Sequence, residues 1–248
     1  MPELPEVEAA ARRLRAVAVR QTIAGVERLH PAMRRQLKPS TVKRLVGETI
    51  TGVERRGKYQ ILRLSGGGAL VVHFRMTGDW EIGTVSEPLP AYARVVITLG
   101  NGARVALVDP RALSALSTVV PDVGPDPTDS SFTAAQFHAL LARRKAPIKV
   151  ALLDQRLVGG VGNIYAAEAL WKAKINPRRP ARSLTAGEAG RLLRAVREVM
   201  ESGGRYTYGE GRFAVYDHEG QACRRCGTPI ERFTQAGRST YWCPCCQV

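Results

Sequence analysis

The chain has 248 residues, 44% of them hydrophobic and only 6% aromatic, so it can bury one large core or two modest ones, mainly with aliphatic side chains. It carries 37 Lys and Arg against 22 Asp and Glu, a formal net charge of +15. The basic residues are scattered through segments that also carry a hydrophobic core pattern. This distribution favours a folded protein surface that binds a polyanion over a solvated basic tail. No apolar run reaches the roughly 18 residues of a membrane span, and acidic residues stand where a signal peptide is basic, so we expect no membrane association and a cytoplasmic location.

The first half of the chain is predicted to be one helix followed by a strand-rich region. Apolar residues at helical spacing predict a helix from about Glu3 to Val17. From Thr22 to about Val108, short β-rich runs alternate with glycine-containing breaks, a pattern typical of a β-sandwich or barrel. The predicted strands include Thr49–Val53, Tyr59–Leu64, Ala69–Phe74, Arg94–Leu99 and Ala103–Val108.

The second half begins with a proline-rich interruption, Pro121–Pro127, which predicts a linker. After it the pattern is helical, and Thr133 and Thr185 are expected to be N-caps. A cysteine-rich tail, Gln221–Val248, is predicted to be a small separate unit. The predicted helices are Thr133–Arg143, Ile148–Asp154, Asn163–Lys172 and Thr185–Glu201.

The strongest single signal is two Cys-x-x-Cys pairs, Cys223 with Cys226 and Cys243 with Cys246, separated by 16 residues. This spacing is typical of a four-cysteine zinc site, and in the cytoplasm paired cysteines are metal ligands more often than disulfides. Because Cys245 adjoins Cys246, the fourth ligand is ambiguous, but x-x spacing on both sides favours Cys246. Four thiolates complete the tetrahedral coordination of a zinc ion and leave no open position. We therefore expect one structural zinc ion, which holds a basic hairpin.

Two further segments are candidates for anion binding, and each has a plain structural alternative. The glycine-rich turn Leu157–Asn163 opens a predicted helix, where free backbone N–H groups bind phosphate, but it is equally compatible with a tight interhelical turn. The stretch Arg143–Lys149 is either a solvated helix end or a second contact to the same phosphate. Lys58, taken alone, has the pattern of a surface lysine.

The N-terminus carries the sharpest catalytic hypothesis. Removal of Met1 would leave Pro2 as a free secondary amine beside the Glu3 carboxylate, a nucleophile next to an acid/base group. An α-amino group has a pKa of about 7.7–8, well below about 10.4 for lysine, so more of it is neutral near pH 7. The alternative is a helix leader, with proline near the first turn and acidic residues at the positive end of the helix dipole.

Several motifs occur in order along essentially the whole chain: Met1–Glu8, Arg56–Tyr59, His73–Gly78, Asp109–Arg111, Leu152–Tyr165, and Arg238–Thr240 with the paired cysteines. Together they resemble the formamidopyrimidine-DNA glycosylase/endonuclease VIII family of base-excision repair enzymes, and most of all its formamidopyrimidine-DNA glycosylase branch. The joining of the N-terminal motif to the C-terminal finger is highly specific to that family. The resemblance therefore raises the catalytic interpretation of Pro2 well above the helix leader.

The resemblance implies an α+β multidomain fold. Its parts are an N-terminal catalytic β-sandwich domain with flanking helices (1–117), a linker (118–132), a helix–two-turns–helix DNA-binding domain (133–212) and a zinc-finger β-hairpin (213–248). The implied partner of this monomer is double-stranded DNA with a damaged base, which is flipped out to be reached. The implied activity is that of a bifunctional DNA glycosylase and abasic-site lyase for oxidised or ring-opened bases.

The resemblance also implies roles for individual residues. The Pro2 nitrogen attacks C1′ of the damaged nucleotide to give a Schiff base, Glu3 helps to open the sugar by proton transfer, and β- and δ-elimination follow. Lys58 matches the proton donor in β-elimination, and Arg238 matches the finger arginine that clamps phosphates and serves δ-elimination. The remaining implied DNA contacts are the wedge Met76, Arg111 facing the orphaned base, Leu113, Tyr92, and, near the phosphates, Arg144, Lys149 and Asn163.

Three departures from the family pattern bear on the substrate. Leu113 stands where the purine-directed branch commonly has Phe, and Tyr92 and Arg94 stand where it often has histidines. Val215 follows Gly204 by only eleven residues, whereas the branch that captures 8-oxoguanine has a longer segment there, which folds over the everted base. These departures weaken the expectation of an 8-oxoguanine preference and leave ring-opened purines and oxidised pyrimidines open.

Other functions therefore stay in competition with the leading one. The run Tyr241–Pro244 resembles the endonuclease VIII branch, which prefers oxidised pyrimidines. A non-catalytic zinc-finger protein that binds nucleic acid would share the charge and the finger but would not need Pro2 or Glu3. A family member that binds damage without excising the base is a further alternative.

Overall fold

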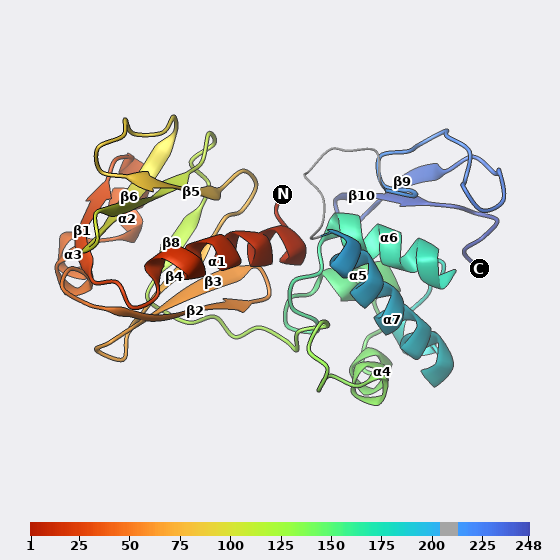
Figure 1. Cartoon of the computed structure of the whole chain (residues 1–248). Helices are drawn as coiled ribbons and strands as arrows, with labels where there is room; N and C mark the ends of the chain where they lie inside the picture. The colour runs from red at the N-terminus through yellow and green to blue at the C-terminus, as the bar shows by residue number, and fades with distance from the viewer. Residues whose placement is uncertain (204–212) are drawn as a thin grey trace. The chain divides into compact units, whose positions relative to one another are not determined.

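The computed structural model describes residues 1–203 and 213–248 (Figure 1). The chain divides into two compact units, Met1–Asp122 and Val123–Val248. The short segment that follows Gly203 falls within 204–212, outside the described residues, so the expectation about it stays a prediction. Within the described ranges, no helix is long and apolar enough to cross a membrane.

Helix α1 (Leu4–Ala18) opens the first unit and confirms the predicted N-terminal helix (Figure 1). Its start is a capping box in which the Glu3 N–H donates to Glu6 Oε2 at 2.9 Å and the Glu3 side chain accepts from the Glu6 backbone. Pro5 sits in the first turn, where its missing N–H costs no helical hydrogen bond. One apolar face of α1 is buried against β2, β3 and β5, which fixes the direction in which the N-terminus enters the unit.

Two antiparallel four-stranded sheets make up most of the first unit. One has the order β1-β6-β7-β5, with bounds Ile23–Arg28, Ala93–Leu99, Ala103–Val108 and Asp79–Thr84. The other has the order β2-β3-β4-β8, with bounds Ile50–Arg56, Tyr59–Leu64, Ala69–His73 and Ala115–Ser117. One large core buries residues of both sheets and of α1, such as Ile97, Leu62 and Leu14. The predicted β-sandwich is confirmed.

Two short helices interrupt the region that was expected to contain only strands. They are α2 (Pro31–Gln36) and α3 (Pro39–Leu45), six and seven residues long. Each begins with proline at its first position, and each buries one side chain, Met33 or Leu45. One buried position gives no helical period, so hydrophobic spacing could not reveal them.

The second unit is helical as predicted. Its helices are α4 (Ala134–Ala142), α5 (Ile148–Leu153), α6 (Asn163–Ala173), the 3₁₀ turn η1 (Ala181–Ser183) and α7 (Ala186–Gly203). Thr133 caps α4 through a capping box with Gln136, which confirms that prediction. Helix α7 packs against both α4 and α6.

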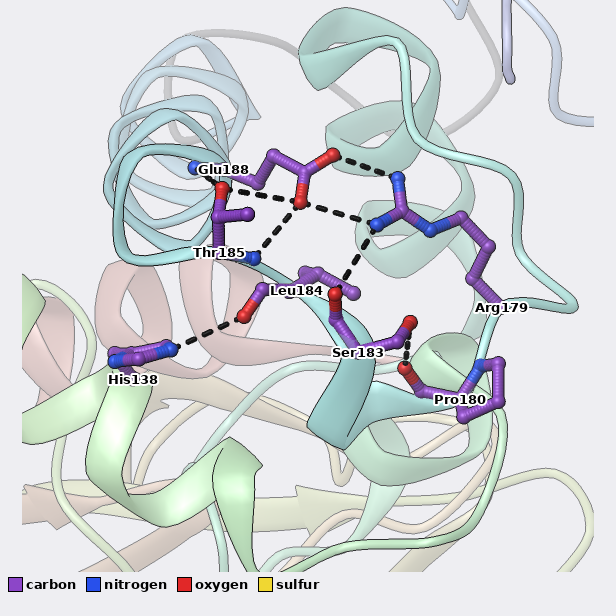
Figure 2. Close-up of polar contacts among 7 residues, drawn as sticks. All are labelled: His138, Arg179, Pro180, Ser183, Leu184, Thr185 and Glu188. Atoms are coloured by element: carbon purple, nitrogen blue, oxygen red, sulfur yellow. Dashed lines mark hydrogen bonds and ion pairs between the residues drawn. The ribbon is translucent and has the colours of Figure 1, made fainter.

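The start of α7 is held by a polar cluster that includes its predicted cap (Figure 2). Thr185 Oγ1 accepts from the Glu188 N–H at 3.2 Å, and Glu188 Oε2 accepts from the Thr185 N–H at 2.8 Å. Arg179 donates two hydrogen bonds to the Glu188 carboxylate, at 2.7 and 3.0 Å. His138 Nε2 lies 3.0 Å from the Leu184 carbonyl and ties α4 to the same turn. The pKa of Glu188 is lowered to about 2, chiefly by the hydrogen bond from Arg179, against an opposing effect of burial.

Residues 124–132, in the second part of the predicted linker, are packed onto the second unit. The Gly124 N–H donates to the Gln155 carbonyl at 2.9 Å, and Phe132 is 5% exposed. Arg197 on α7 donates to the backbone carbonyls of Pro127 and Phe132 at 2.7 and 2.6 Å. Hydrogen bonds from the Arg197 guanidinium, in place of regular secondary structure, thus order this proline-rich stretch.

The chain ends in a two-stranded hairpin, β9 (Glu231–Gln235) and β10 (Arg238–Trp242). Ala236 and Gly237 form its two-residue turn, and both have positive φ, 49° and 72°, as the right-handed strand twist demands. Tyr241 and Ile230 pack with Ala167 of α6 in a small core, so the hairpin is held against that helix.

Candidate functional site

The first group of candidate residues lies at the N-terminus of α1. Glu3 is 1% exposed and Lys58 is 6% exposed, although Lys58 had the pattern of a surface lysine. Lys58 is the second residue of the two-residue turn between β2 and β3. Arg55 holds this turn to α1, because its Nε donates to Glu8 Oε2 at 2.9 Å and its Nη1 to the Gly57 carbonyl at 3.2 Å.

The charges around the N-terminus act on one another. The pKa of the Met1 terminal ammonium is lowered, first by burial and also by the positive charge of Lys58, while Glu3 and Glu6 act to raise it. Lys58 and the two carboxylates therefore lie close enough to the start of the chain for their charges to act on it. The structure retains Met1, so the nitrogen of Pro2, the next residue, is an amide in it.

His73, to which sequence reasoning gave no role, adjoins the same group. Its ring packs edge-on against Tyr59 with centroids 4.6 Å apart, and its Nδ1 accepts from the Arg75 N–H at 2.9 Å. The pKa of His73 is lowered to about 4 by burial and by the charges of Arg75 and Lys58, so the imidazole is neutral near pH 7. The signal in the sequence was its place in the His73–Gly78 motif.

A second group in the first unit consists of side chains exposed on loops. Met76 is 41% exposed and Leu113 is 44% exposed, so neither is a core residue, and Arg111 is exposed as well. Tyr92, 59% exposed, has a left-handed backbone with φ of 61°. Exposed large apolar side chains beside an exposed arginine suit a surface that meets bases.

In the second unit, Arg238 begins β10 directly after the hairpin turn and is exposed. Two other candidates hold the strand beside it. Lys149 of α5, 1% exposed, donates through Nζ to the Ser239 carbonyl at 2.8 Å and to Thr240 Oγ1 at 2.7 Å. Asn163 Nδ2, at the start of α6, donates to the same Ser239 carbonyl at 3.0 Å. Both side chains therefore brace the strand that carries Arg238.

The glycine-rich turn fits its structural alternative better than an anion site. The Gly159 N–H donates to the Pro125 carbonyl and the Gly160 N–H to Gln155 Oε1, each at 2.9 Å. These two amides have protein partners, as the structural alternative expects, and the phosphate contact proposed for the start of α6 stays a prediction. Arg144 is half-buried, and its Nη2 lies 3.4 Å from Asp154 Oδ2.

The paired cysteines form one compact group. The Sγ atoms of Cys223, Cys226, Cys243 and Cys246 all lie within 4.8 Å of one another. Tetrahedral coordination at a Zn–S distance of about 2.3 Å places sulfurs about 3.8 Å apart, and the Cys223–Cys246 and Cys226–Cys243 separations are 4.0 and 3.5 Å. The residues thus fit a structural metal ion. Cys245 is outside the group, which resolves the ambiguity in favour of Cys246.

Family models match the chain in three consecutive parts. The models are the formamidopyrimidine-DNA glycosylase N-terminal domain over residues 1–116, the H2TH domain of the same enzyme over 123–210, and a zinc finger found in FPG and IleRS over 220–248. The chain belongs to the formamidopyrimidine-DNA glycosylase family. The resemblance inferred from the motifs is confirmed.

Relatives within the formamidopyrimidine-DNA glycosylase family match over nearly full length. The enzyme of that name from Moorella thermoacetica is 44% identical over 94% of each chain. The one from Thermus thermophilus is 41% identical over 100% of this chain and 98% of its own. Among solved structures, the Lactococcus lactis enzyme bound to abasic-site DNA matches with a TM-score of 0.89 at 31% identity, covering 99% of both chains. A MutM complex with DNA containing carbocyclic 8-oxo-G matches with a TM-score of 0.90 at 31% identity over 99% of both chains.

Proposed function

We propose that this family member is a base-excision DNA glycosylase with abasic-site lyase activity. The observation that carries the proposal is the buried pair of Glu3 and Lys58 around the start of the chain, in a protein that matches the family from end to end. The helix-leader alternative accounts for the hydrogen bond from the Glu6 backbone to the Glu3 side chain, but it gives no reason for Lys58 to be only 6% exposed. A non-catalytic binder would have no use for a buried lysine whose charge acts on a half-buried terminus.

The chemistry follows from a terminal secondary amine at Pro2. With Met1 removed, the Pro2 lone pair attacks C1′, the C1′–N bond to the base breaks, and Glu3 passes a proton to the ring oxygen as the sugar opens. The resulting iminium withdraws electrons, so the C2′ proton is lost and the 3′ phosphate leaves. A second elimination releases the 5′ phosphate, and water frees the amine.

The other catalytic assignments follow the positions of the charged groups within each unit. Lys58, whose charge acts on the terminus, serves proton transfer in β-elimination. Arg238, exposed after the finger turn, clamps the phosphates and serves δ-elimination. These assignments make residues 1–117 the catalytic domain. The linker 118–132 joins it to the parts that grip DNA, the helical part 133–212 and the finger 213–248.

The DNA contacts divide by chemistry. Met76 and Leu113 are proposed to fill the stack that the flipped nucleotide leaves, and Arg111 to face the orphaned base. Tyr92 and Arg144 are proposed as further contacts to the duplex. Lys149 and Asn163 are proposed to act beside the phosphates through the strand of Arg238, which they hold.

We propose that the metal ion at the four-cysteine group is zinc. Four thiolates leave no open position, so the ion would supply folding energy to the finger and no chemistry. Cys223, Cys226, Cys243 and Cys246 would hold it.

The preferred substrate is proposed to be a ring-opened purine in double-stranded DNA. A Lactococcus lactis relative has been crystallised with Fapy-dG DNA and a MutM with DNA containing carbocyclic 8-oxo-G, so structural relatives of this chain bind both lesions. The short segment that contains 204–212 disfavours 8-oxoguanine in this chain. The endonuclease VIII-like alternative, based on Tyr241–Pro244, predicts faster release of thymine glycol or dihydrouracil.

Borohydride trapping tests the lyase. Protein shown by mass spectrometry to begin at Pro2 is incubated with an abasic-site oligonucleotide and borohydride, and a covalent adduct is expected. Blocking the amine by retaining Met1 should abolish the adduct, and Glu3→Gln should suppress base release from a formamidopyrimidine duplex. Absence of any adduct with an open Pro2 would remove the proposed mechanism. Absence of strand scission with both wild type and Glu3→Gln would favour a non-catalytic binder. Separate duplexes with the four lesions named here rank the substrates.

A further inference from the structure

The loop that carries Arg111 and Leu113 is built around one buried carboxylate. Asp109 follows β7 and is 0% exposed. Its Oδ2 accepts from the N–H groups of Leu113 and Ser114 at 2.7 Å each and from Ser114 Oγ at 2.8 Å. Its Oδ1 accepts from the Arg111 N–H at 3.2 Å. The carboxylate thus fixes the backbone on both sides of the two exposed side chains.

The same carboxylate reaches the loop that carries Met76. Thr77, which follows Met76, donates its hydroxyl to Asp109 Oδ1. Ser114 Oγ also lies 3.3 Å from the Phe74 carbonyl. A Cβ at Gly78 would meet Ser114 Oγ at 2.4 Å, so only glycine allows the two loops to approach so closely. Loops that are more than thirty residues apart in sequence are thereby joined side by side.

Arg94 braces the first of these loops from the neighbouring strand β6. Its Nε donates to the Asp109 carbonyl at 2.6 Å, and its Nη2 donates to the Pro110 carbonyl at 3.0 Å. The guanidinium lies 5.7 Å from the Tyr92 ring centroid. Arg94 stands where the family's purine-directed branch often has histidine, and here it is committed to backbone carbonyls.

Both loops contain strained backbone next to the exposed side chains. Arg75, before Met76, has φ of 56°, and Ala112, between Arg111 and Leu113, has φ of 52°. Non-glycine residues in this left-handed region are costly and persist only where the surroundings over-determine them. Around Ala112, hydrogen bonds from Arg111 and Leu113 to Asp109 supply that determination. The loop of Arg75 is held by the Arg75 N–H, which donates to His73 Nδ1, and by Thr77, which donates to Asp109. The hydrogen bonds to Asp109 outweigh its burial and hold the pKa of its carboxyl below the ordinary value.

We infer that Asp109 and Arg94 are positioning residues that hold Met76, Arg111 and Leu113 as one preformed ridge, ready to enter the base stack when the nucleotide everts. The inference rests on the proposed function, since it assigns the ridge to DNA. A preformed ridge enters the duplex without first losing the entropy of two disordered loops. Loss of the carboxylate would leave the Leu113 and Ser114 N–H groups without their acceptor, so Asp109 is what holds the backbone beneath the exposed side chains.

The test separates duplex opening from chemistry. The variants are Asp109→Asn, Thr77→Val and Arg94→Lys. Asp109→Asn keeps the size of the side chain but places an amide N–H₂, itself a donor, against groups that donate to the native carboxylate. The matched control is Arg63→Lys, which alters an arginine–carboxylate pair with Glu54 at 2.9 Å on the surface of β3. Opening is followed by 2-aminopurine fluorescence beside the lesion in a duplex, and chemistry by borohydride trapping on a single-stranded abasic oligonucleotide, which needs no opening.

Loss of one buried hydrogen-bond partner predicts that Asp109→Asn opens the lesion duplex about 5- to 100-fold less well. Thr77→Val and Arg94→Lys should show smaller losses in the same direction, and single-strand trapping should stay at the wild-type level in all three. If Asp109→Asn does not fold, Thr77→Val and Arg94→Lys decide. Duplex opening equal to the Arg63→Lys control, or an equal loss on single-stranded DNA, would overturn the inference. Failure of the wild-type protein to trap would instead refute the proposed function.

Discussion

Replacement of the buried Lys149 by methionine tests whether α5 holds the finger strand. The change keeps the length of the side chain and removes an ammonium that donates to the Ser239 carbonyl and to Thr240 Oγ1, at 2.8 and 2.7 Å. The Ser239 carbonyl keeps Asn163 as a donor at 3.0 Å. The Thr240 hydroxyl, 0% exposed, loses the partner that its oxygen accepts from.

The magnitude follows from this asymmetry. One buried acceptor left without its donor costs about 1–3 kcal/mol, and release of a buried charge from its desolvation penalty offsets part of that cost. We therefore expect the free energy of unfolding to fall by about 1–2 kcal/mol. At about 2–4 °C per kcal/mol for a chain of this size, the Tm should fall by about 2–8 °C.

Thermal unfolding followed by circular dichroism measures the shift, with Lys145→Met, an exposed lysine before α5, as the control. A double-mutant cycle with Thr240→Val sharpens the test, because the hydroxyl loss should cost less in the Lys149→Met background than in the wild type. A Lys149→Met protein that melts together with the Lys145→Met control, or costs that simply add in the cycle, would refute the reasoning.

Three further outcomes are expected. The pKa of Glu188 is near 2 in the folded protein and 4.5 ordinarily, so the stability that Glu188 contributes is present above about pH 4.5 and is lost as the pH falls toward 2. The Tm difference between wild type and Glu188→Gln should therefore shrink between pH 4.5 and pH 2. A Tm difference that stays constant would contradict the pairing with Arg179. Trp171 Nε1 donates to Cys223 Sγ at 3.4 Å, so Trp171→Phe should speed zinc release to a chelator by about tenfold, and unchanged release would show that this bond does not stabilise the thiolate. DNA affinity should fall steeply from low to moderate salt as counterions are released, and a flat response would exclude binding through contacts between basic side chains and DNA phosphates.

The elements that hydrophobic spacing specified were predicted nearly residue by residue. Strand β3 has the predicted bounds Tyr59–Leu64, and α4 begins after its predicted cap Thr133. Helices α2 and α3 escaped prediction, because a helix with one buried residue leaves no period to detect. The cysteine spacing predicted the metal site, since four ligands on two short knuckles need little help from the rest of the fold.

The roles of single polar residues depended on the fold. Lys58 looked like a surface lysine in the sequence, and Lys149 was expected in a solvated helix end or at a phosphate, but tertiary packing buries both. In the sequence Asp109 was only the first residue of the motif Asp109–Arg111. Its hydrogen-bond donors come from the loop after β4 and from its own loop. No local pattern predicts such contacts, because they join residues far apart in the chain.

By itself the sequence determined the family, the order of the helices and strands that carry a hydrophobic period, the metal-ligating cysteines and the basic character of the surface. Each of these features depends on residue type and on spacing along the chain, and both can be read from the sequence without knowing how the chain packs. Only the tertiary structure decided that Glu3 and Lys58 are buried around the terminus, that Lys149 braces the strand of Arg238, and that Asp109 joins two loops. Burial and hydrogen bonding are properties of neighbours in space, and the packing of α1, the sheets and the finger chooses those neighbours.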